Sequence, residues 1–177
     1  MKKILLMAAF AVASLTANAQ AWIGGSLGFD YEKYKDVDAK TTFSIAPTVG
    51  YNLDEKLALG LELSLAFGNE GRSYLYTNNK TQDIKVAPFV RYTFAKAGMA
   101  SFFVDGGVGI GSHKVGDADA TTTWHLGVRP GISVDLGGNF SAVATMGYLG
   151  YRHMEDYSHF GLNANGNALS FGLYYTF

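Results

Sequence analysis

The chain has 177 residues, the length of one domain, and its formal net charge of −1 argues against nucleic-acid binding. It contains no cysteine, which excludes disulfide bonds as its means of stabilisation. Hydrophobic residues make up 48% of the chain, and 22 glycines stand against 3 prolines, a mixture unusual for a soluble exported domain.

The N-terminal segment, residues 1–19, is predicted to be a signal peptide. Lys2 and Lys3 precede an apolar run at 4–15, and Ala17-Asn18-Ala19 has the small-x-small spacing of a cleavage site before Gln20. The apolar run is shorter than the roughly 20 residues that a spanning helix needs. The mature domain is then expected to be residues 20–177, with a net charge of about −3 and no transmembrane helix.

From residue 22 onward, large apolar residues alternate with small or polar ones, which is the period of a β-strand. The stretch 57–67 is the plainest example, because its odd positions are all large and apolar and only Glu62 is large among its even positions. This pattern predicts eight strands, at 22–31, 41–53, 57–67, 83–94, 100–111, 122–136, 140–151 and 167–177. Short connections (54–56, 95–99, 137–139) alternate with long polar ones (near 32–40, 68–82, 112–121, 152–166), so all short turns and both termini are expected at one end.

Three segments that begin at Pro47, Pro88 and Pro130 repeat one pattern, with apolar residues at the second, fourth and sixth positions after the proline. A period of about 40 residues is typical of propeller blades. Each period here holds only two strands, so the repeated unit is a hairpin. Because a proline removes a ladder hydrogen bond from a strand, we expect a local bulge at each of the three.

One face of the predicted strands is bulky, and the other is small or charged. An eight-stranded barrel is just wide enough inside for side chains to fill, and five large side chains per strand would overfill it. The bulky face must therefore point outward into lipid, where a closed barrel satisfies every backbone group. Outward aromatic residues also cluster at the strand ends, as in the two girdles of a membrane barrel, whereas a soluble sandwich has no reason to sort them by height. The predicted girdles are Tyr31, Phe43, Phe67, Trp124 and Tyr148 on the long-loop side, and Tyr51, Tyr92, Phe94, Phe102, Phe140, Tyr175 and Phe177 on the short-turn side.

The signal peptide, the eight alternating strands, the short turns and the terminal Phe177 together resemble the small outer-membrane barrels of the OmpA-transmembrane and OmpX type. The resemblance covers residues 20–177 and implies an all-β, eight-stranded antiparallel up-and-down transmembrane barrel in the bacterial outer membrane. It implies short turns in the periplasm and four long loops outside the cell. It also implies that the outer-membrane insertion machinery reads the alternate residues of the last strand: Leu169, Phe171, Leu173, Tyr175 and Phe177.

Four charged residues on the inward face are predicted to form an ion-pair network: Glu62, Arg91, Asp105 and Arg129. Pairing each hairpin about its short turn gives three facing pairs at one lumen level: Glu62–Thr48, Asp105–Phe89 and Thr145–Gly131. Arg91 is expected one layer nearer the periplasm and Arg129 one layer nearer the cell surface. We expect the network to plug the lumen, because eight strands leave no aqueous channel. The alternative is a charged constriction in a narrow passive pore for small solutes.

A lipid A-modifying acyl hydrolase is a more distant alternative. The last long connection carries His153, Ser158 and His159, with Glu155 and Asp156 nearby, and a serine nucleophile needs a base within hydrogen-bond reach. Neither histidine has a serine two residues later, as His-x-Ser lipid A deacylases do, and adjacent residues on a strand face opposite ways. We therefore predict no catalytic, cofactor-binding or metal-binding residues.

The long loops carry aromatic residues among mixed charges, and loops on a rigid scaffold often bear binding function. These residues are Tyr34, Tyr74, Tyr76, Tyr157 and Phe160. The predicted function is structural or a cell-surface interaction in adhesion or defence, and plain solvated loops are the alternative. We expect a monomer in outer-membrane lipid without a nucleic-acid partner, and the sequence does not identify a surface ligand.

Overall fold

The structure is a computed structural model that describes residues 20–32, 40–69, 80–116, 119–154, 157–163 and 169–177. The predicted signal peptide at residues 1–19 lies outside the described residues. The strands are β1 (Ala21–Glu32), β2 (Lys40–Asn52), β3 (Leu57–Asn69), β4 (Lys80–Ala97), β5 (Ala100–Val115), β6 (Thr121–Gly137), β7 (Phe140–Met146), β8 (Tyr148–Met154), β9 (Tyr157–Asn163) and β10 (Leu169–Thr176). Within the described ranges, no helix is long and apolar enough to cross a membrane.

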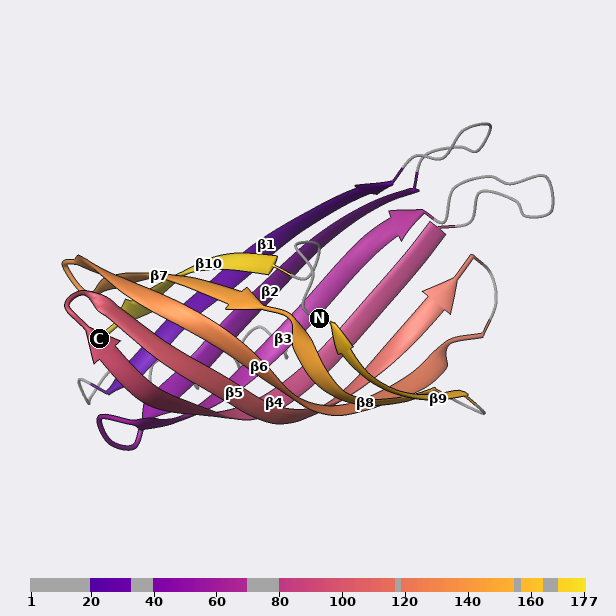
Figure 1. Cartoon of the computed structure of the whole chain (residues 1–177). Helices are drawn as coiled ribbons and strands as arrows, with labels where there is room; N and C mark the ends of the chain where they lie inside the picture. Colours follow the sequence, from indigo (N-terminus) through magenta and orange to yellow (C-terminus); the bar gives the residue numbers. More distant parts are fainter. Residues whose placement is uncertain (1–19, 33–39, 70–79, 117–118, 155–156, 164–168) are drawn as a thin grey trace.

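Eight of these strands close into an antiparallel ring in the order β1-β2-β3-β4-β5-β6-β7-β10. The ring closes where β10 pairs with β1, from Trp22–Thr176 to Leu27–Phe171. Consecutive strands from β1 to β7 pair with each other and β10 joins β7 to β1, so the predicted all-β up-and-down barrel is confirmed. Figure 1 shows the short turns and the C-terminus gathered at one end of the tilted strands.

Local turn chemistry fixes the hairpins at this short-turn end. Gly138 and Asn139 both have positive φ, 60° and 70°, as a two-residue type I′ hairpin turn requires. In the turn between β2 and β3, Asp54 Oδ1 accepts the backbone N–H groups of Lys56 at 2.7 Å and Leu57 at 2.9 Å. Each turn thereby sets the register of the strands that it joins.

The predicted seventh strand, 140–151, is two strands separated by a bulge at Gly147, whose φ is +71°. Both β7 and β8 pair with β6, and the register changes by one residue between the pairs Gly131–Thr145 and Val128–Leu149. An extra residue on one strand exchanges the faces of those that follow. Tyr148 therefore lines the lumen, and its predicted place in the outward aromatic girdle is wrong.

The strands extend into segments that were predicted to be loops. β5 reaches Val115, and residues 157–163 form β9, which pairs with β8 from Tyr148–Asn163 to Met154–Tyr157. The predicted polar loop over 152–166 is therefore wrong for 152–154 and 157–163. The exposed residues at alternate positions of β9 are Ser158, Phe160 and Leu162, a mixture too short and too polar at one end to stand out as a strand.

Each mid-strand proline keeps its ladder to one neighbouring strand and interrupts the ladder to the other. The β2–β3 pairing skips 46–47 and the β4–β5 pairing skips 87–88, but the register is the same on both sides of each gap. The bulges predicted at Pro47 and Pro88 are therefore wrong. Only Pro130 faces a register shift, the one at Gly147. The missing N–H of proline thus costs ladder bonds on one side without requiring an extra residue.

The outward face of the ring is apolar and exposed, as lipid requires. Exposed aromatic residues occur at both ends: Phe29, Phe43, Phe67 and Trp124 far from the short turns, and Tyr92, Phe94, Phe102 and Phe140 near them. Exposed aliphatic residues between them include Ile45, Leu61, Val108 and Val128. The buried side chains point into the lumen and include Trp22, Thr48, Glu62, Phe89, Arg91, Phe103, Asp105, Val143 and Thr145.

Candidate functional site in the barrel lumen

Arg91 and Asp105 face each other across β4 and β5 and form a two-bond ion pair. Arg91 Nε donates to Asp105 Oδ1 at 2.7 Å, and Arg91 Nη2 donates to Asp105 Oδ2 at 2.9 Å. The residues are only 9% and 3% exposed. The partner of Asp105 predicted from sequence, Phe89, is wrong by two residues, because this hairpin closes at Gly98 and Met99, further along the chain than assumed.

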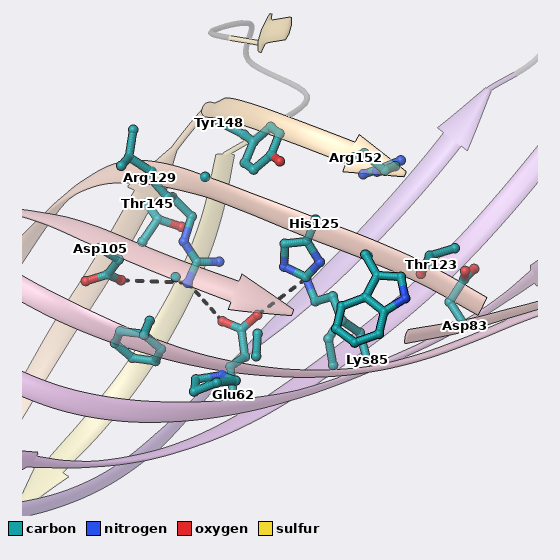
Figure 2. Close-up of a pocket in the computed structure, with 18 of the residues that line it drawn as sticks. Glu62, Asp83, Lys85, Asp105, Thr123, His125, Arg129, Thr145, Tyr148 and Arg152 are labelled. Atoms are coloured by element: carbon teal, nitrogen blue, oxygen red, sulfur yellow. Dashed lines mark hydrogen bonds and ion pairs between the residues drawn. The ribbon is translucent and has the colours of Figure 1, made fainter. Parts of the chain in front are cut away.

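Arg129 links two carboxylates, and it also lies opposite Asp105 in the β5–β6 register. Its Nη2 donates to Glu62 Oε2 at 3.0 Å and lies 3.7 Å from Asp105 Oδ2 (Figure 2). The predicted separation into layers is therefore wrong for the arginines, since Arg91, Asp105 and Arg129 are direct cross-strand partners. The structure thus brings together all four residues that the sequence assigned to the ion-pair network.

Lys85 belongs to the same network, although the sequence prediction did not include it. Its Nζ lies 3.8 Å from Glu62 Oε1, on the side of the carboxylate away from Arg129. The signal was present in the alternation, because Lys85 is two residues from Ala87, the cross-strand partner of Glu62. Two positions on one strand share a face, so Lys85 points into the lumen as well.

Aromatic rings surround Arg91 toward the short-turn end. Its guanidinium carbon lies 3.8 Å from the ring centre of Phe103 and 5.5 to 5.6 Å from those of Trp22, Phe89 and Tyr174. Trp22 and Tyr174 stack with ring centres 4.9 Å apart. Tyr174 faces inward near this end as predicted, whereas Trp22 and Phe103 were missed. Cation–π contact adds to the ion pair in holding Arg91.

Each of these rings packs against a glycine of a neighbouring strand. A Cβ atom added to the glycine would collide with the ring in four pairs: Gly24 with Tyr174, Gly50 with Trp22, Gly60 with Phe89 and Gly131 with Phe103. The inward glycines therefore provide the space in which large rings fit inside a narrow barrel. The short-turn half of the lumen is filled as a result.

On the other side of the network the lumen widens into a cavity of about 670 Å³, which we call the upper cavity (Figure 2). Its charged and polar lining includes Glu62, Ser64, Asp83, Lys85, Asp105, Ser112, His113, Thr123, His125, Arg129, Thr145, Tyr148, Arg152 and Ser170. His113 Nδ1 lies 2.6 Å from Asp83 Oδ1. Tyr148 and Arg152 reach this cavity because of the bulge at Gly147.

A serine and a histidine meet on β8 and β9. His153 Nδ1 lies 3.0 Å from Ser158 Oγ, and the Tyr151 hydroxyl donates to the same oxygen at 2.8 Å. Sequence reasoning missed this contact because it depends on cross-strand pairing rather than adjacency. Glu155 and Asp156 lie outside the described residues. Within the described ranges no carboxylate pairs with His153, and no three metal-ligating side chains form a cluster.

The last strand forms the seam of the barrel. Phe171 and Leu173 are exposed on the outward face, and Tyr175 packs against Phe140 and Phe177 with ring centres 5.0 and 5.3 Å apart. The backbone of Leu169 begins the pairing of β10 with β7. Recognition of these residues by the insertion machinery stays a prediction.

Comparison with known proteins agrees with this architecture. Residues 4–177 match the family model described as the outer membrane protein β-barrel domain. The chain is similar in structure to Neisserial surface protein A (NspA), with a TM-score of 0.52 and 17% identity over 90% of this chain and 98% of that chain. A second similar structure is the Yersinia pestis outer membrane protein Ail in a phospholipid bilayer nanodisc, with a TM-score of 0.46 and 16% identity over 89% of this chain and 99% of that chain. No curated protein sequence matches this chain.

Proposed function

Because the chain belongs to the outer membrane β-barrel family and lies in the bacterial outer membrane, we propose that it is a non-catalytic surface-interaction protein with a closed lumen. The supporting observation is the short-turn half of the lumen, where Arg91 is bonded to Asp105 and surrounded by four aromatic rings. Within the described residues, no buried side-chain nitrogen or oxygen lacks a hydrogen-bond partner. The filling of the short-turn half supports the proposal, because water and ions would have to pass these rings and the bonded arginine.

Single-channel recording on the refolded chain in a planar bilayer tests the closed lumen. We expect no steady conductance from the wild type. The double variant Trp22→Ala/Arg91→Ala, which removes part of the filling, should show small openings and serves as the positive control. Steady wild-type conductance that changes in Arg129→Ala would instead support the narrow passive pore.

The proposed lack of catalysis extends to the pair formed by His153 and Ser158. A serine nucleophile needs a base that is itself oriented by a third group. Here Ser158 Oγ accepts a hydrogen bond from Tyr151, and no described carboxylate holds the histidine. Lipid A from cells that overexpress the protein should have an unchanged mass spectrum. A mass change that disappears in Ser158→Ala would overturn this proposal.

We assign the surface interaction to the end of the barrel opposite the short turns. β1 ends at Glu32 and β3 at Asn69 at this end, and the long polar segments 33–39 and 70–79 follow them in the sequence. Phe160 and Leu162 on β9 pair with Tyr151 and Leu149 at the level of Leu126 and Val128, so their 72% exposure belongs to the lipid-facing band. The predicted loop residues Tyr34, Tyr74 and Tyr76 lie outside the described residues, and so does the side chain of Tyr157.

Adhesion of cells that express the protein tests this assignment. Replacing residues 70–79 by a short turn, and separately residues 33–39, should reduce adhesion. Heat-dependent gel mobility verifies that each barrel still folds. Unchanged adhesion in both variants would favour a purely structural role. We also propose a monomer, removal of residues 1–19 on export, and reading of the last strand by the insertion machinery.

A further inference from the structure

The upper cavity carries more positive than negative charge. Its carboxylates are Glu62, Asp83 and Asp105, and its cations are Lys85, Arg129 and Arg152. Arg91 adds a fourth cation through its bonds to Asp105. With the lining histidines counted as neutral, one positive charge is left over.

Two of these cations have hydrogen-bond donors to spare. The Lys85 ammonium group has three N–H donors, and within the described residues its ion pair is with Glu62 at 3.8 Å, a carboxylate that also binds Arg129. Lys85 therefore has donors left for a ligand. For Arg152, no ion pair with a carboxylate occurs in the part of the chain that the structure describes. Figure 2 shows Lys85, His125 and Arg152 projecting from different strands around one space, with Arg129 on the side of the ion-pair network.

The cavity also offers room and neutral donors. Its volume of about 670 Å³ is in the range of small-molecule sites. Hydroxyl groups from Ser64, Ser112, Thr123, Thr145 and Ser170 line it, and so do the inward glycines Gly107, Gly127 and Gly147. Hydroxyl groups can donate hydrogen bonds to an oxyanion.

We propose that the upper cavity binds a phosphate dianion, held by Lys85 and Arg152 from two sides with Arg129 at its base. A dianion matches two cations that have spare donors, and charge-assisted hydrogen bonds to phosphate are strong. The phosphate is either free in solution or part of a lipid headgroup. The inference rests on the proposed function, because a closed short-turn half leaves the opposite end as the route into the cavity.

Titration calorimetry with inorganic phosphate tests the site on the refolded chain in maltoside micelles, which contain no phosphate. We expect saturable binding that weakens about tenfold or more in Lys85→Gln and in Arg152→Gln. Lys96→Gln, which removes the same charge at the exposed short-turn end, is the matched control and should bind as the wild type does. Heat-dependent gel mobility verifies that each variant is folded.

Competition identifies the source of the phosphate. Displacement of bound phosphate by phosphorylated lipid A, but not by dephosphorylated lipid A, would assign the site to a headgroup. Failure of both to displace it would assign the site to a free anion. Absence of saturable phosphate binding, or equal weakening by Lys96→Gln, would overturn the inference. Conductance measured on the same preparation separates the two proposals: a silent barrel that binds no phosphate overturns only the site, and a conducting barrel that binds phosphate overturns only the closed lumen.

Discussion

Substitution of Asp105 by asparagine should strongly destabilise the barrel, because it leaves the buried Arg91 without its counter-charge. Asp105 accepts two charge-assisted bonds from Arg91, at 2.7 and 2.9 Å, and Arg129 lies 3.7 Å away. Breaking a buried ion pair from one side costs about 3–5 kcal/mol. The side-chain oxygen of asparagine can still accept a hydrogen bond from Arg91. We therefore expect a loss at the lower end of this range, about 3 kcal/mol in the free energy of unfolding. The surrounding rings cannot replace the lost charge, since a cation–π contact contributes only about 0.5–2 kcal/mol.

Urea unfolding in lipid vesicles, followed by tryptophan emission, measures this loss. Trp22 is a local reporter, because its ring lies 5.5 Å from the Arg91 guanidinium. Glu55→Gln, in the exposed turn between β2 and β3, removes the same charge and should stay within about 0.5 kcal/mol of the wild type. Replacing both partners, as Arg91→Met/Asp105→Leu, should recover most of the loss because four aromatic rings already surround Arg91 and Arg129 keeps its bond to Glu62. A loss below about 1 kcal/mol in Asp105→Asn, or a double variant no more stable than the single one, would refute the reasoning.

Three further outcomes are expected. Gly24→Leu places a side chain against the ring of Tyr174 at the β1–β10 seam, so the heat-modifiable band of the closed barrel should disappear on gels. Backbone hydrogen bonds from the N–H groups of residues 56 and 57 lower the pKa of Asp54. The stabilisation that ionised Asp54 gives the folded barrel is therefore complete above its ordinary pKa of about 3.9 and is lost as the pH falls through the lowered pKa. The stability difference between wild type and Asp54→Ala should therefore shrink below about pH 4 in urea titrations. Phe177→Ser should slow assembly in cells while detergent refolding keeps its normal rate, and equal effects in both assays would argue for a structural role alone.

The ring could be predicted because a strand in lipid has to display its alternation. From Leu57 to Phe67 of β3, every outward position is large and apolar, and Glu62 interrupts only the inward set. The pattern fails in β9, where Ser158 precedes Phe160 and Leu162 in a strand of only 7 residues. It also fails at Gly147, because the sequence pattern alone does not show that an extra residue is inserted there and that the following side chains change faces.

The candidate site could be predicted as a set of inward residues but not as a set of contacts. The alternation of inward and outward positions along each strand is enough to place Glu62 and Arg129 in the lumen. Their contact joins residues 67 positions apart, on β3 and β6, and it depends on the stagger of the whole ring. The position of Arg152 in the upper cavity depends on the bulge at Gly147, and a count of alternate residues from β7 would place this arginine outside.

Because Gly147 forms a bulge, we expect that deleting this residue destabilises the barrel less than substituting it does. Gly147 is the extra residue where β6 changes register, and it faces the region of Pro130. Because the register is the same on both sides of the gaps at Pro47 and Pro88, a proline does not require the extra residue. Deletion of Gly147 should therefore give continuous pairing with β6 and keep Tyr148 on the inward face. Gly147→Val retains the residue but forces a β-branched side chain to φ +71°, at a cost of about 1–3 kcal/mol. In urea titrations the deletion variant should be more stable than Gly147→Val and should still bind phosphate, whereas a deletion variant that fails to close while Gly147→Val folds would show that the bulge itself is needed.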